Sequence, residues 1–96
     1  MKIPKKLKVA GVTYRVSVVD DPKTIDGRFE YGTANHMQGE IVLNTATPQE
    51  MQEETLLHEV IHCVNERFGL ALEEDQVKAL GAGLYQILKD NKLLKE

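Results

Sequence analysis

Apolar and polar residues alternate along the first part of the chain, with the spacing of β-strands. The alternation covers residues 7–9 and 12–19, where β-branched residues are frequent, and Ala10-Gly11 separates the two runs. A period of two favours strands, and a two-residue connection between such runs favours a hairpin. The sequence therefore predicts that the domain begins with a β-hairpin.

A second hairpin is predicted from Arg28 to Ala34 and from Glu40 to Asn44, around the turn at residues 35–39. The polar stretch before it, through Asp26-Gly27, predicts a surface loop. The strand Glu40 to Asn44 has a further interest, because a strand at a sheet edge can pair with an extended peptide. An edge position and an ordinary paired position are both compatible with the sequence.

The apolar positions take a helical period after residue 47. In Thr47-Pro48-Gln49-Glu50, a Thr N-cap, a Pro at the first helical position and a Glu three residues after the cap predict a capping box. From there to about Phe68, apolar residues cover much of the helix circumference, and Gly69 ends the helix. This helix is predicted to be the buried centre of the domain.

A second helix is predicted from about Glu73 to Asp90. Its apolar residues at helical spacing form the predicted inward stripe: Val77, Leu80, Leu84, Ile87 and Leu88. Gly81 and Gly83 lie inside this helix, where each glycine costs about 1 kcal/mol relative to Ala. Their presence predicts that another element packs closely against the second helix.

The composition fits one small α+β domain over residues 1–96. The chain is 42% apolar and 28% charged, which is typical of a globular domain. The expected architecture is a small antiparallel sheet of two hairpins followed by two packed helices.

Lysines cluster at the start of the chain, at positions 2, 5, 6 and 8, but without aromatic residues between them. A solvated strand edge is therefore favoured over nucleic-acid binding.

Membrane insertion and export are not expected. No apolar run approaches the ~18 residues of a membrane span, and no signal peptide is recognisable at the N-terminus. Cys63 is the only cysteine, which excludes an internal disulfide and suits a reducing cytoplasm. Its direction on the helix, 100° from His62, predicts a buried and inert thiol rather than a ligand.

The first helix carries His58-Glu59-Val60-Ile61-His62, an H-E-x-x-H pattern. Residues four apart lie on one helix face with Cβ atoms about 5–6 Å apart, so both histidines can reach one metal ion at ~2.0–2.1 Å. Glu59 projects beside them, where it can take a proton from water at the metal. The alternative is two hydrogen-bonded histidines and an exposed Glu59. We favour a zinc site, although iron and manganese are compatible with the same residues.

A catalytic zinc usually takes three protein ligands, and an acidic cluster opens the second helix. At 100° per residue, Glu73 lies near the middle of the apolar stripe and Glu74 on its flank beside Gly81, whereas Asp75 lies opposite. Helical geometry therefore leaves Glu73 and Glu74 as candidates and disfavours Asp75. Acidic residues are also favourable at a helix N-terminus without any metal.

The C-terminal half resembles the small zincin-type metallopeptidases of bacteriophages and prophages. The similar segments are residues 53–62, 74–77 and 83–91, and the N-terminal half is similar only in the order of its elements. In outline the chain is similar to the gluzincins, including the ImmA/IrrE type. That resemblance implies zinc held by His58, His62 and Glu74, with Glu73 in reserve and Glu59 as general base. It also implies the cytoplasm of a bacterial host.

The expected function is therefore that of a zinc-dependent peptidase acting on a peptide or protein, and strand 40–44 is the expected docking site for it. His36 and Tyr31 are candidates to stabilise the oxyanion, although an ordinary surface position is favoured for each. The alternative is a catalytically silent, metal-stabilised binding or regulatory protein of phage origin, because so short a chain leaves little room for specificity pockets. A third hypothesis is a nucleic-acid-associated protease that resembles the SprT type, and the basic N-terminus is the only feature that supports it.

Overall fold

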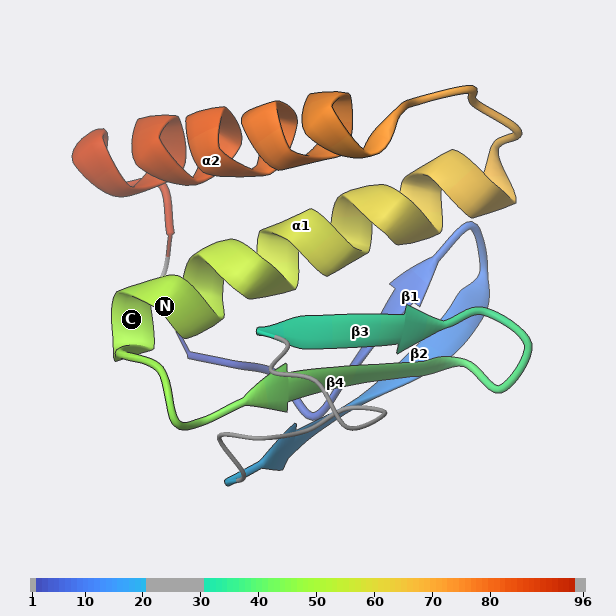
Figure 1. Ribbon diagram of the computed structural model, residues 1–96, viewed down its shortest axis with the longest axis horizontal. Coiled ribbons are helices and arrows are strands. Elements are labelled where there is room, and N and C mark those ends of the chain that lie inside the picture. Colours follow the sequence, from blue (N-terminus) through green and yellow to red (C-terminus); the bar gives the residue numbers. More distant parts are fainter. Residues whose placement is uncertain (1, 21–30, 95–96) are drawn as a thin grey trace.

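Four strands are followed by two helices, which confirms the expected α+β class (Figure 1). The computed structural model describes residues 2–20 and 31–94. The elements are β1 (Lys6–Val9), β2 (Val12–Val19), β3 (Gly32–Asn35), β4 (Glu40–Asn44), α1 (Gln49–Arg67) and α2 (Glu74–Asp90). They form three layers, with α1 between the sheet and α2. Neither described helix is long and apolar enough to cross a membrane.

The sheet has the order β1-β2-β4-β3. Both predicted hairpins are present, because β1 pairs with β2 and β3 with β4 in antiparallel fashion. The two hairpins are joined through β2 and β4, however, and these strands are parallel, with Val16 opposite Ile41. The sheet is therefore mixed rather than antiparallel. Local turn signals specify each hairpin, but they do not specify how one hairpin joins the other.

Strand β4 lies inside the sheet, between β2 and β3. Both of its edges are paired, so the expectation that a peptide docks along Glu40 to Asn44 is wrong. The strand at this edge of the sheet is β3, which also contacts α1. The predicted loop through Asp26-Gly27 and the predicted start of the strand, residues 28–30, lie outside the described residues.

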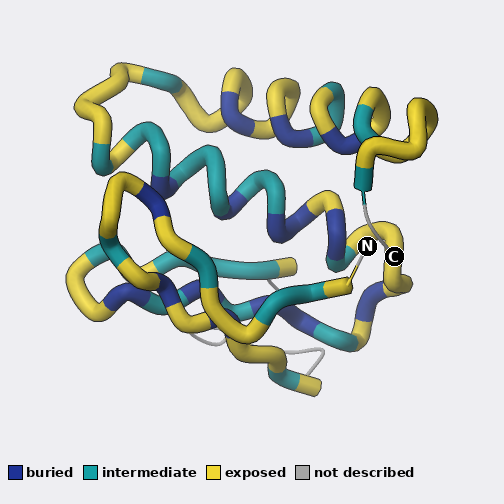
Figure 2. Tube along the Cα trace, turned by 180° about the vertical axis from the view of Figure 1, so that it is seen from behind, coloured by how far each residue is buried: buried dark blue, intermediate teal, exposed yellow. Residues whose placement is uncertain are grey.

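The apolar core lies between α1 and the sheet (Figure 2). Tyr14 of β2, Ile41 and Leu43 of β4, and Cys63 of α1 are fully buried there, so the two central strands and α1 pack their inward side chains into one layer. Cys63 is buried as expected, and burial raises the pKa of its thiol above the usual value. The thiol is therefore protonated at neutral pH, and its role is that of a core residue.

The predicted capping box at the start of α1 is wrong. Pro48 is the N-cap and receives no side-chain hydrogen bond, and α1 begins at Gln49. The Thr47 hydroxyl instead donates to the backbone carbonyl of Asn44 at 2.9 Å, in a buried connection where that carbonyl needs a partner. The other end agrees with the prediction, since α1 ends at Arg67 and Gly69 adopts a φ of 66°.

Helix α2 packs through a different face from the one its apolar residues predict. Val77, Gly81 and Tyr85 are its buried residues. Three members of the predicted inward stripe are substantially exposed: Leu80 at 44%, Leu84 at 44% and Ile87 at 56%. Most of the stripe is therefore turned away from α1, although Val77 is buried as expected and Leu88 is half-buried.

A buried polar contact stabilises this orientation. The Tyr85 hydroxyl donates a 2.6 Å hydrogen bond to Glu53 of α1, which is only 2% exposed. Gln49 Nε2 donates to the same carboxylate at 3.0 Å, and Lys89 Nζ donates to the Tyr85 hydroxyl at 3.2 Å. Burial alone would raise the pKa of Glu53, but hydrogen bonds from Tyr85 and Gln49 lower it below the usual value. The ionised carboxylate thus fixes α2 against α1.

Candidate metal centre

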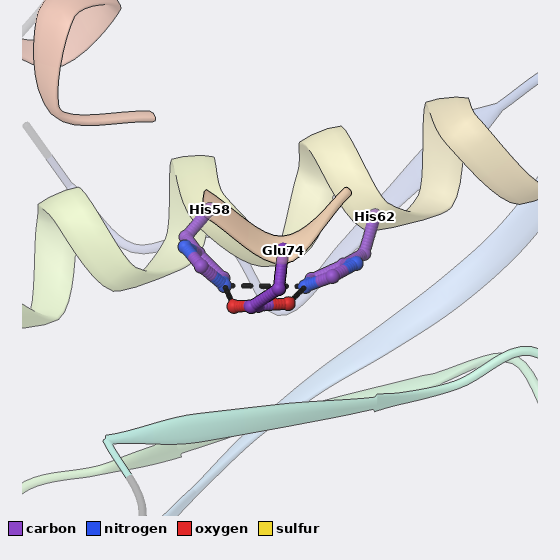
Figure 3. A group of neighbouring side chains, drawn as sticks. All are labelled: His58, His62 and Glu74. Carbon is purple, nitrogen blue, oxygen red and sulfur yellow. Dashed lines mark hydrogen bonds and ion pairs between the residues drawn. The ribbon is translucent and has the colours of Figure 1, made fainter. Parts of the chain in front are cut away.

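His58, His62 and Glu74 converge on one point between α1 and α2 (Figure 3). The Nε2 atom of His58 lies 3.0 Å from one carboxylate oxygen of Glu74, and the Nε2 atom of His62 lies 2.9 Å from the other. The two Nε2 atoms are 3.2 Å apart. Of the three acidic candidates at the start of α2, Glu74 is therefore the one that meets the histidines.

These separations fit a single metal ion. Ligands at 2.0–2.1 Å in a tetrahedral arrangement lie roughly 3.3 Å from one another, close to the spacing of these atoms. Each neutral imidazole has one N–H, so if both Nε2 atoms donate to Glu74, no hydrogen lies between the two nitrogens. One cation bound by all three residues would take a lone pair from each of them. Two imidazoles and a carboxylate are a donor set that suits zinc.

The electrostatic surroundings keep His58 in its neutral, metal-binding form. Burial lowers the pKa of His58 below the usual value, and the neighbouring His62 and Lys78 lower it further. The Glu74 carboxylate opposes this but does not reverse it. A lowered pKa means that the proton leaves His58 at a lower pH, so its lone pair is available at neutral pH.

The close approach of α2 to α1 depends on Gly81. A Cβ atom at this position would lie 3.3 Å from the Cα atom of His58 and 3.5 Å from its Cβ atom. Gly81 follows Glu74 by seven residues, which is about two helical turns, so both lie on one face of α2. The glycine therefore lets the helix that carries Glu74 come close to the histidines. The close packing that the two glycines predicted is confirmed for Gly81 but is wrong for Gly83, where a Cβ atom would meet nothing within 4 Å.

The two glycines of α2 offer a matched test of this contact. Gly81→Ala and Gly83→Ala gain the same helix propensity, up to about 1 kcal/mol. A Cβ atom at Gly83 would meet nothing within 4 Å. We expect Gly83→Ala to raise the melting temperature and leave zinc affinity unchanged. Gly81→Ala should gain little stability and lose about tenfold in zinc affinity, because α2 must shift relative to His58.

Thermal unfolding and zinc titration calorimetry on both variants measure these two effects. Equal zinc affinity in the two variants would show that the spacing of the helices at Gly81 does not control the centre.

Glu59 lies beside the three converging residues and is only 6% exposed. It lines two clefts that adjoin them. The Tyr31 cleft, about 270 Å³, is lined also by Tyr31, Gly32 and Lys78. The His36 cleft, about 390 Å³, is lined also by His36 and Ala34. An exposed Glu59 is therefore contradicted, whereas the hydrogen-bonded histidines of the same alternative are present. Each oxyanion candidate lines one of the two clefts, Tyr31 the first and His36 the second.

The remaining acidic candidates have other partners. Glu73 is the N-cap of α2, where its side chain and that of Gln76 form a reciprocal capping box. Asp75 accepts a hydrogen bond from the backbone N–H of Gln76. Neither belongs to the group of residues that converge with His58 and His62. Sequence reasoning missed Lys78 in the Tyr31 cleft, although its place four residues after Glu74 on the same helix is a usable signal.

Comparison with known proteins adds nothing to this geometry: no protein-family model matches the chain, and no curated protein or solved structure matches it.

Proposed function

We propose that this protein is a zinc-dependent peptidase. The observation that carries the proposal is the convergence of His58, His62 and Glu74 next to the buried Glu59, at the junction of two open clefts. Zinc held by these residues would supply a Lewis acid that activates water at neutral pH and polarises a peptide carbonyl. The donor set and its spacing fit that ion.

Glu59 supplies the base in this proposal. Its carboxylate takes the proton from the attacking water and passes it to the nitrogen of the leaving amine, so no net proton is gained or lost. Its position in both clefts places it where water and substrate can meet. His36 and Tyr31 are the side chains of these clefts that can donate a hydrogen bond to a carbonyl oxygen as it gains negative charge.

Substrate binding is best supported along β3. This strand lies at the edge of the sheet, and its first residue, Gly32, lines both clefts. An extended peptide that pairs with β3 would gain backbone hydrogen bonds and cross the centre from one cleft to the other. The expected partner thus remains a peptide or protein, and only the docking strand changes, from β4 to β3.

A cleavage screen tests the proposal without knowledge of the substrate. Wild-type protein with zinc and the His58→Ala/His62→Ala variant would be incubated with a bacterial lysate, and new protein N-termini would be identified by labelling and mass spectrometry. We expect cleavage sites with the wild type alone. No difference between the two samples would overturn the peptidase proposal.

A second candidate function is a metal-stabilised binding protein without turnover. The exposed apolar stripe at Leu80, Leu84 and Ile87 favours it, because grouped apolar side chains on a surface often mark protein contacts. If this second function is correct, the protein should bind zinc but the cleavage screen should find no cleavage sites that depend on the wild type. For both candidates we keep the bacterial cytoplasm and a phage or prophage origin as expectations.

A further inference from the structure

A second cluster of polar side chains adjoins the His36 cleft through His36, which lines it. It joins Tyr14 of β2, His36 of the turn between β3 and β4, and Arg67 at the end of α1. The Nε atom of Arg67 donates to the Tyr14 hydroxyl at 2.9 Å, and that hydroxyl lies 3.1 Å from Nδ1 of His36. The guanidinium also lies 5.4 Å from the centre of the Tyr14 ring. Tyr14 is fully buried.

The direction of the hydrogen bond between Tyr14 and His36 follows from its neighbours. Arg67 can only donate, so the Tyr14 oxygen accepts from Arg67 and its own proton is free to point elsewhere. Burial raises the pKa of Tyr14, so the hydroxyl keeps its proton. The other acceptor close to Tyr14 is the Cys63 sulfur, which is weak as a protonated thiol. Nδ1 of His36 is the stronger acceptor.

We propose that Arg67 and Tyr14 are positioning residues that hold Nδ1 of the His36 ring as the acceptor of the Tyr14 hydroxyl, which leaves Nε2 to carry a hydrogen and to donate it into the His36 cleft. With Nδ1 occupied as an acceptor, Nε2 is the nitrogen that carries the hydrogen. The ring lines the same cleft as His58, Glu59 and His62. The role of this N–H towards a substrate carbonyl rests on the proposed peptidase function, but the tautomer does not.

The backbone of His36 is held by the same arginine. Nη2 of Arg67 donates to the carbonyl oxygen of His36 at 2.6 Å. Arg67 therefore fixes the main chain of the turn directly and the imidazole through Tyr14. A side chain that must donate a hydrogen bond at a defined place needs both its backbone and its ring to be held in position. The partners of Arg67 lie 31 and 53 residues away from it in sequence. The sequence pattern therefore gave no sign of this cluster.

Nitrogen NMR of the His36 ring tests the proposal directly. In uniformly ¹⁵N-labelled protein at neutral pH, we expect Nδ1 of His36 to resonate as an unprotonated nitrogen and Nε2 as a protonated one. Tyr14→Phe removes the donor, and the spectrum should then show a mixture of the two tautomers. Tyr85→Phe, at the other buried tyrosine that carries a polar contact, is the matched control and should leave His36 unchanged. An Nδ1–H form in the wild type, or no change in Tyr14→Phe, would overturn the proposal.

Arg67→Lys provides a second variant if Tyr14→Phe folds poorly. Lysine keeps the positive charge but loses the planar fork that reaches both Tyr14 and the His36 carbonyl, so the same tautomer mixture is expected. If a cleaved substrate has been found, either variant should lower kcat by roughly 10–100-fold with little change in KM. A defined tautomer together with an empty cleavage screen would support the positioning role and reject the peptidase function.

Discussion

Glu59→Gln should abolish peptide hydrolysis while the protein still binds one zinc ion. The amide has nearly the same shape as the carboxylate but cannot take a proton from water. Loss of a general base of this kind lowers the rate by roughly 10²–10⁴-fold, whereas His58, His62 and Glu74 remain in place to hold the metal. Cleavage of a peptide from the lysate screen, with zinc content measured on the same samples, provides the comparison.

Glu50→Gln is the matched control for this experiment. Glu50 lies in the first turn of α1, is exposed and lines none of the described clefts, so its loss should leave the rate unchanged. Hydrolysis by Glu59→Gln within tenfold of the wild type would contradict the assignment of the base. Loss of zinc from this variant would mean instead that Glu59 helps to hold the metal.

Zinc should raise the thermal stability of the wild type by a large margin. A ligand that binds only the folded state at about 1,000 times its Kd adds about 4 kcal/mol. For a domain of this size, each kcal/mol shifts the melting temperature by about 4–8 °C. We therefore expect a rise of roughly 15–30 °C, because the ion would cross-link α1 to α2 through Glu74. Differential scanning calorimetry with zinc and then with excess EDTA measures the effect and its reversal.

The pH dependence of this stabilisation follows from the ligands. Zinc binds the neutral imidazole. The rise in melting temperature that zinc causes should therefore be lost as the pH falls and protons compete with the metal for the imidazole nitrogens. The lowered pKa of His58 delays its own protonation to a lower pH than usual. The Glu74→Gln variant should keep the packing of α1 against α2 but lose most of the zinc-dependent rise in melting temperature. A rise of equal size in the His58→Ala/His62→Ala variant would place zinc elsewhere on the protein.

Locally encoded features were predictable from the sequence. Two histidines four residues apart on an amphipathic helix must share a face, and the structure puts their Nε2 atoms 3.2 Å apart. The end of α1 at Gly69 and the two hairpins also depend on residues close in sequence. Metal binding by these residues stays a prediction, although the geometry that it requires is present.

Only the tertiary structure decided how these local elements fit together. The sheet order places β4 inside the sheet and β3 at its edge, and the packing of α2 on α1 leaves Leu80, Leu84 and Ile87 substantially exposed. Helical period specifies which residues share a face, but the rotation of one helix against another depends on partners distant in sequence. The cluster of Tyr14, His36 and Arg67 could not be predicted for the same reason, because its members are distant in sequence. In contrast, His58, Glu59 and His62 lie within one helical segment and could be found from the sequence alone.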